Sequence, residues 1–168
     1  MATRSARLRR LLVKRIGRLV TMDATRRVLR DAWLLAEDGR VKSLGEGRPP
    51  HAPGAEVLDA RGGIATPGLI NTHHHMFQNL ARAFAPIANL PLLPWLAGHM
   101  PLWRHFTPEA LFVATQVAGV ELMLSGCTLT SDHHYLFPRD GGAEMLDAGF
   151  AAAAELGLRY VGCRGSVN

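Results

Sequence analysis

Two histidines separated by one residue, His73 and His75, are the residues of this sequence best suited to hold a metal ion. They follow a predicted strand at 69–72, and alternate side chains of a strand share a face, so both imidazoles can face one ion while His74 points away. Neutral imidazole suits zinc, iron, nickel or copper. A catalytic zinc site typically has three protein ligands and a water, so two histidines alone make an incomplete site.

The segments around this pair predict strands that alternate with helices. The predicted strands are Leu69–Thr72, Cys127–Thr130 and Leu158–Cys163. One helix begins at the cap Thr107-Pro108-Glu109 and ends at Gly126, and a second helix at 143–156 is ended by Gly157. This alternation is typical of βαβ units with a parallel sheet, and the ligand-like residues collect where the first two strands end.

Two stretches of this part carry further expectations. Residues 111–124 are apolar on most sides, which predicts a helix buried between two layers. Residues 86–101 contain four prolines and are expected to form a long irregular connection.

Before Thr66 the sequence consists of short β-runs broken by turn residues. The runs are 11–22, 32–36, 40–44 and 56–58. Glu37-Asp38-Gly39-Arg40 predicts a tight hairpin, because Asp-Gly readily adopts positive φ at a turn. We therefore expect a small β-layered segment at 1–65 and the first βα units of a second architecture at 66–168.

The net charge of +5 does not indicate a nucleic-acid partner. Seven positive charges precede the first acid, Asp23, which leaves the remainder of the chain at −2; they are Arg4, Arg7, Arg9, Arg10, Lys14, Arg15 and Arg18. Such a start also resembles a transit peptide, but it runs straight into a β-rich pattern. No apolar run approaches the roughly 20 residues that span a bilayer, so we expect a cytoplasmic protein without a membrane partner.

Cys127 and Cys163 are far apart in apolar runs, which favours buried thiols over a disulfide.

The run Pro-Gly-Leu-Ile-Asn-Thr-His-His-His at 67–75 resembles the first barrel strand of the amidohydrolase superfamily. Residues 11–23 and 34–47 resemble the β-sandwich that leads into that barrel. A closer similarity, to the branch of 8-oxoguanine deaminases and s-triazine hydrolases, lies in Thr72–Leu80, Pro94-Trp95-Leu96, Leu102-Trp103, Thr107-Pro108-Glu109, Leu124–Thr128 and Ser131-Asp132-His133. The resemblance implies an α/β fold: a small β-sandwich segment, then the start of a TIM-type (β/α) barrel with about three strands.

The resemblance also implies a chemistry. His73 and His75 would be ligands of one divalent metal, zinc or alternatively iron, and the pKa of a metal-bound water falls toward about 7. Hydroxide would attack an aminated purine or s-triazine-like ring, hydrolysing a C–N bond other than a peptide bond. Relatives complete the site with two further histidines, a glutamate and an aspartate from later strands, so we assign no catalytic residue here.

Gln78, His133 and Trp103 are candidates for contacts with a small heteroaromatic substrate. Gln78 occupies a position where relatives place a substrate-contacting amide, although a solvent-facing helix residue is the alternative. His133 either lines the pocket or makes a structural hydrogen bond. Trp103, with Trp95, either walls a planar substrate or packs the long connection. The superfamily resemblance also makes a homo-oligomer plausible.

A closed barrel takes about 250 residues, whereas about 100 follow the β-segment of this 168-residue chain. We therefore expect the amino-terminal part of a longer enzyme. The alternatives are a catalytically incompetent truncated amidohydrolase, a subunit completed by another chain, or a hydrolase of cyclic amides.

Overall fold

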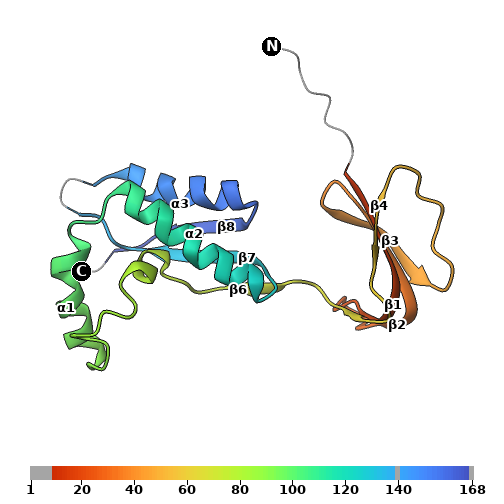
Figure 1. Ribbon diagram of the computed structural model, residues 1–168, viewed down its shortest axis with the longest axis horizontal. Coiled ribbons are helices and arrows are strands. Elements are labelled where there is room, and N and C mark those ends of the chain that lie inside the picture. Colours follow the sequence, from red (N-terminus) through yellow and green to blue (C-terminus); the bar gives the residue numbers. More distant parts are fainter. Residues whose placement is uncertain (1–8, 139–140, 167–168) are drawn as a thin grey trace, which may run out of the picture. The chain divides into compact units, whose positions relative to one another are not determined.

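A computed structural model describes residues 9–138 and 141–166 (Figure 1). The chain divides into two units between Pro67 and Gly68. Of the basic residues near the start, Arg4 and Arg7 lie outside the described residues, while the stretch from Arg10 to Arg18 lies in the first strand.

The first unit is a five-stranded sheet. Its strands are β1 (Arg10–Val20), β2 (Val28–Glu37), β3 (Arg40–Glu46), β4 (Glu56–Asp59) and β5 (Ile64–Ala65). The order is β3-β2-β1-β4, with β5 also paired to β1. Its buried core is Ile16, Leu19 and Ala32, from the two longest strands.

The predicted hairpin joins β2 and β3. Glu37 pairs with Arg40, and Asp38 and Gly39 have φ values of 48° and 76°. Positive φ at both central residues is the geometry of the two-residue turn that Asp-Gly favours, so this prediction is confirmed.

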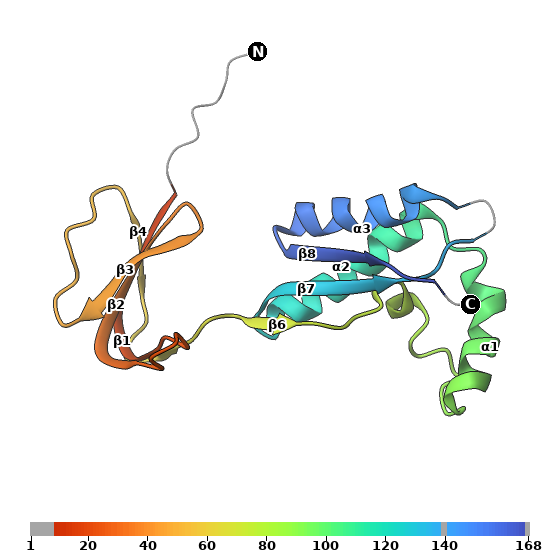
Figure 2. The same cartoon turned by 180° about the vertical axis from the view of Figure 1, so that it is seen from behind.

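The second unit contains the expected parallel strands. Its elements are β6 (Leu69–Asn71), the 3₁₀ helix η1 (Met76–Leu80), α1 (Leu92–Trp103), α2 (Pro108–Leu124), β7 (Cys127–His134), α3 (Ala143–Leu156) and β8 (Arg159–Arg164). The strands are parallel in the order β6-β7-β8. The helices α2 and α3 pack on each other and on β7 and β8, and Figure 2 shows the strands in front of α2. The predicted βαβ arrangement is therefore confirmed.

The irregular connection expected at 86–101 is wrong, because α1 begins at Leu92. Pro91 is the N-cap and Pro94 lies in the first turn, where a missing N–H breaks no intrahelical hydrogen bond. Only Pro101 lies far enough into the helix to lose one. The number of prolines therefore gave a wrong prediction for this segment. Their positions relative to the helix start determine whether a helix can form.

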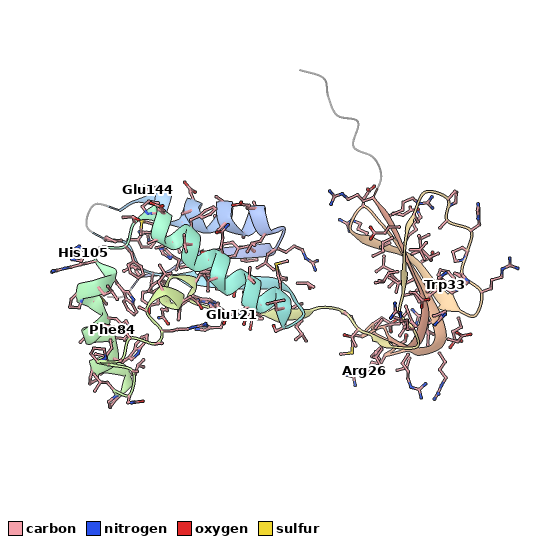
Figure 3. All side chains as sticks on the ribbon, in the orientation of Figure 1. Arg26, Trp33, Phe84, His105, Glu121 and Glu144 are labelled. Atoms are coloured by element: carbon pink, nitrogen blue, oxygen red, sulfur yellow. The ribbon has the colours of Figure 1, made fainter. Side chains whose placement is uncertain are left out.

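The N-cap and the C-terminal end of α2 lie where the sequence predicts them. The Thr107 hydroxyl accepts a hydrogen bond from the Ala110 N–H at 3.2 Å, and Gly126 has a φ of 86° just past the helix. The expectation that this helix is buried between two layers is wrong, since Val113, Val117 and Val120 are each more than 40% exposed. One face packs on α3 and η1, and the opposite face is solvent-accessible. Glu121, labelled in Figure 3, extends from α2 and bonds to Arg82, two residues past η1.

Both thiols are free; Cys127 is buried and Cys163 half-buried. Among residues 9–138 and 141–166, no helix combines the length and the apolar character that crossing a bilayer requires.

Candidate metal centre

The structure brings His73 and His75 together just beyond the carboxyl end of β6. Their Nε2 atoms are 3.2 Å apart, and the rings meet edge to face with centroids separated by 4.7 Å. His74 is turned differently: its Nδ1 is buried without a hydrogen-bond partner, and burial lowers the pKa of its imidazole. The side chains of residues 73–75 therefore alternate in direction as expected from the sequence, although β6 itself ends at Asn71.

The distance between the two Nε2 atoms can be compared with a coordination shell. Ligand nitrogens at about 2.0–2.1 Å from a tetrahedral zinc lie about 3.3 Å from each other. The observed 3.2 Å matches that spacing. The separation of the two atoms is therefore that of two ligands of a tetrahedral zinc.

The tautomer of His75 is also suited to metal binding. Its Nδ1 lies 2.8 Å from the backbone carbonyl oxygen of His133, and a carbonyl can only accept, so Nδ1 carries the proton. The Nε2 atom of a neutral ring is then left with its lone pair. Metal-binding histidines are commonly oriented by a contact of this kind through their other nitrogen.

Residues 132–133 of β7 hold the histidine segment in place. The His133 N–H donates to the carbonyl of His74 at 2.8 Å, and the Met76 N–H donates to the Asp132 carboxylate at 3.0 Å. The His133 ring lies 4.6 Å from that of His73, and its Nε2 is 3.3 Å from the Thr72 carbonyl oxygen. His133 is therefore beside the pair, with its imidazole directed to the backbone.

Gln78 is linked to the histidine pair by Tyr135. Its Nε2 donates to the Tyr135 hydroxyl at 2.9 Å, and the Tyr135 ring lies edge to face with His75 at 5.0 Å. Burial raises the pKa of Tyr135, so its phenol stays protonated at neutral pH. Because Gln78 is half-buried and bonded, it differs from a freely solvated helix residue.

Trp103 lies elsewhere. It is fully buried in a cluster with Phe77, Leu111, Leu136 and Met145. The His99 ring stacks on it at 4.8 Å, and Trp95 packs at its edge. Trp103 is therefore a residue that packs α1 onto the core. Its position gives no support to the role of substrate wall considered from the sequence.

Sequence reasoning missed Asp132, Tyr135 and Tyr160, which surround the histidine segment. Asp132 is buried and accepts a hydrogen bond from the Tyr160 hydroxyl at 2.6 Å. An available signal was a carboxylate directly after the predicted strand 127–130, since Asp is seldom buried without a specific partner. Within the described part of the chain, no third His, Cys, Asp or Glu joins the pair to form a group of three.

Several known proteins have sequences similar to this one. Residues 64–168 match the model of the amidohydrolase family. The 8-oxoguanine deaminase of Pseudomonas aeruginosa is 50% identical over 137 residues, which cover 80% of this chain and 30% of that protein. The hydroxydechloroatrazine ethylaminohydrolase of Pseudomonas sp. (strain ADP) is 39% identical over 160 residues, covering 89% of this chain and 33% of that protein.

Solved structures agree with the fold. The atrazine chlorohydrolase of Arthrobacter aurescens TC1, complexed with zinc, superposes with a TM-score of 0.84 at 29% identity, covering 92% of this chain and 35% of that one. This confirms the predicted fold class, a β-segment followed by the first strands of a (β/α) barrel. The chain thus spans about a third of the length of the relatives it matches. With its family match over 64–168 and its shared fold, the chain belongs to the amidohydrolase family.

Proposed function

We propose that the protein is a metal-dependent hydrolase of C–N bonds other than peptide bonds, and that His73 and His75 hold its divalent metal through Nε2. The observation that carries this proposal is the 3.2 Å separation of those two atoms, together with the His75 tautomer set by His133. Zinc is the metal we propose, with iron as the alternative, because both suit imidazole ligands. The chemistry that such a metal supplies is a nucleophile at neutral pH, since the pKa of a coordinated water falls to about 7.

We further propose that the substrate is an aminated purine or an s-triazine-like ring. Support comes from two relatives, an 8-oxoguanine deaminase at 50% identity and a hydroxydechloroatrazine ethylaminohydrolase at 39%. Gln78 and Tyr135 supply amide and hydroxyl groups next to His75, which suit the polar edge of such a ring. His133 is proposed to border this region from β7.

The pair needs further ligands for catalysis. A catalytic site typically uses three protein ligands, and none beyond the pair joins it among residues 9–138 and 141–166. We propose that further ligands of the metal come from outside the described residues.

The test is metal content and turnover of the purified protein and of matched variants. His73→Ala and His75→Ala should each lose bound zinc or iron by elemental analysis. His51→Ala, an exposed histidine of the first unit, should keep it. Retention of metal by both His73→Ala and His75→Ala would refute the ligand assignment.

Ammonia release should then be measured with guanine-like substrates and aminated triazines, and ring opening with a cyclic amide. Turnover of an aminated ring supports the proposal. Stoichiometric metal without any turnover would instead support the catalytically incompetent alternative.

A further inference from the structure

Asp132 is a buried carboxylate whose described hydrogen bonds include none from a cationic side chain. It is 2% exposed in the middle of the parallel sheet. One oxygen accepts from the Met76 N–H at 3.0 Å and the other from the Tyr160 hydroxyl at 2.6 Å. Burying a carboxylate is costly unless hydrogen bonds compensate it, so these two contacts account for its place in the sheet.

The first contact acts on the peptide that follows His75. Met76 is the next residue, and its N–H can point at Asp132 only if the backbone leaves His75 in one direction. The residue before His75 is fixed as well, because the His74 carbonyl accepts from the His133 N–H at 2.8 Å. The backbone on both sides of His75 is thus held by consecutive residues of β7.

The second contact links this arrangement to β8 and α3. Tyr160 lies in β8, paired with Thr130 of β7. Its hydroxyl lies against Gly149 of α3, where an added Cβ would be 2.8 Å from the oxygen. The phenol is therefore confined between α3 and Asp132, and burial raises its pKa, so it is a permanent donor at neutral pH.

We propose that Asp132, itself held by Tyr160, is a positioning residue for His75. It fixes the peptide after His75, and this keeps the Nδ1 proton of His75 on the His133 carbonyl and its bare Nε2 directed at His73. The consequence for metal affinity rests on the proposed function, whereas the consequence for backbone and tautomer does not.

The experiment compares Asp132→Ala, Asp132→Asn and Tyr160→Phe in the purified protein. Three quantities are measured: hydrogen exchange of the Met76 amide, the His75 tautomer by ¹⁵N NMR, and zinc affinity by competition with a chromophoric chelator. Cys127→Ala is the control, because it removes a buried thiol at the opposite end of β7 from Asp132, where the thiol donates to the Leu129 carbonyl.

We expect Asp132→Ala to accelerate Met76 exchange at least about tenfold, to mix the His75 tautomers and to weaken zinc binding about 10- to 100-fold. Asp132→Asn should restore most of this, because an amide can accept from Met76 and donate to Tyr160. Tyr160→Phe should give an intermediate effect. Cys127→Ala should lower the melting temperature without changing the three quantities.

If Asp132→Ala does not fold, Tyr160→Phe decides the question, because Asp132→Asn is expected to stay close to the wild type. Positioning is refuted if the folded variants melt earlier but keep wild-type Met76 exchange and a wild-type His75 tautomer. If instead the tautomer shifts while His73→Ala and His75→Ala bind zinc like the wild type, the metal assignment fails and the positioning role stands.

Discussion

The Nδ1 atom of His75 lies 2.8 Å from the backbone carbonyl oxygen of His133, so the contact that orients this imidazole comes from the main chain. Every residue type at position 133 supplies that carbonyl. His133→Ala should therefore weaken zinc binding by less than about tenfold, whereas His75→Ala removes a proposed ligand and should abolish it. Chelator competition measures both, and equal losses in the two variants would mean that the His133 imidazole is itself a ligand.

Gln78 is expected to act on substrate binding. Gln78→Leu removes the amide next to Tyr135 and should raise KM about tenfold with little change in kcat, since an uncharged hydrogen bond contributes about 0.5–1.5 kcal/mol. Gln116→Leu is the same change on α2, where the amide bonds to Glu155, and it should leave KM unchanged. Steady-state kinetics with the best aminated ring of the substrate panel checks this. A fall in kcat alone would contradict a binding role.

Gly149 and Tyr160 should be coupled energetically. In the wild type, Gly149→Ala places a Cβ 2.8 Å from the Tyr160 oxygen and should destabilise the protein by about 1–3 kcal/mol. After Tyr160→Phe the nearest atom of that side chain is 3.5 Å away, and the helix propensity of Ala should make the same change stabilising by up to about 1 kcal/mol. Urea unfolding of the two single variants and the double variant measures the change of sign. Strictly additive effects would show that the space at Gly149 is not what confines the phenol.

The ion pair between Arg82 and Glu121 should make stability depend on pH. The two terminal guanidinium nitrogens contact the carboxylate, at 2.6 and 2.7 Å, and these hydrogen bonds lower the pKa of Glu121 from its ordinary 4.5. Because the folded pKa is the lower one, the stabilisation is complete above pH 4.5 and is lost as pH falls through the lowered value. The difference in melting temperature between wild type and Glu121→Gln should therefore be largest near neutral pH and vanish in acid.

Two controls define that last measurement. In an Arg82→Gln background, Glu121→Gln should have no further effect at any pH, because the carboxylate has already lost its cationic partner. Added salt should reduce the Glu121 effect, because both partners are about half exposed. If the difference in melting temperature between wild type and Glu121→Gln persisted unchanged in acid, the variant would be destabilised by a loss of packing and not by the loss of the ion pair.

Local signals in the sequence predicted much of this fold. The Asp38-Gly39 turn, the Thr107 cap and the glycine ends of α2 and α3 each depend on residues within one turn, and the structure has them where the sequence places them. The helix α1 was missed because Pro91 and Pro94 discourage a helix in any count by composition, yet they fall where a helix tolerates them.

The candidate site was predictable only in part. The spacing of His73 and His75 is visible in the sequence, but the groups that orient them are not local. His133 and Asp132 act on this segment from more than 50 residues further along the chain. Trp103 illustrates the converse, since an indole that resembles a substrate wall in sequence lies in the core once Phe77 and Leu111 pack on it.

The contact between His75 and His133 spans 58 residues, and this separation bears on the order of folding events. During synthesis the histidine pair leaves the ribosome well before β7 does, so it exists for a time without the carbonyl that selects its tautomer. Closing so long a loop is among the slow steps of folding. The pair consequently acquires the arrangement described above only after β7 has paired with β6, and a metal held by both histidines would bind after that pairing.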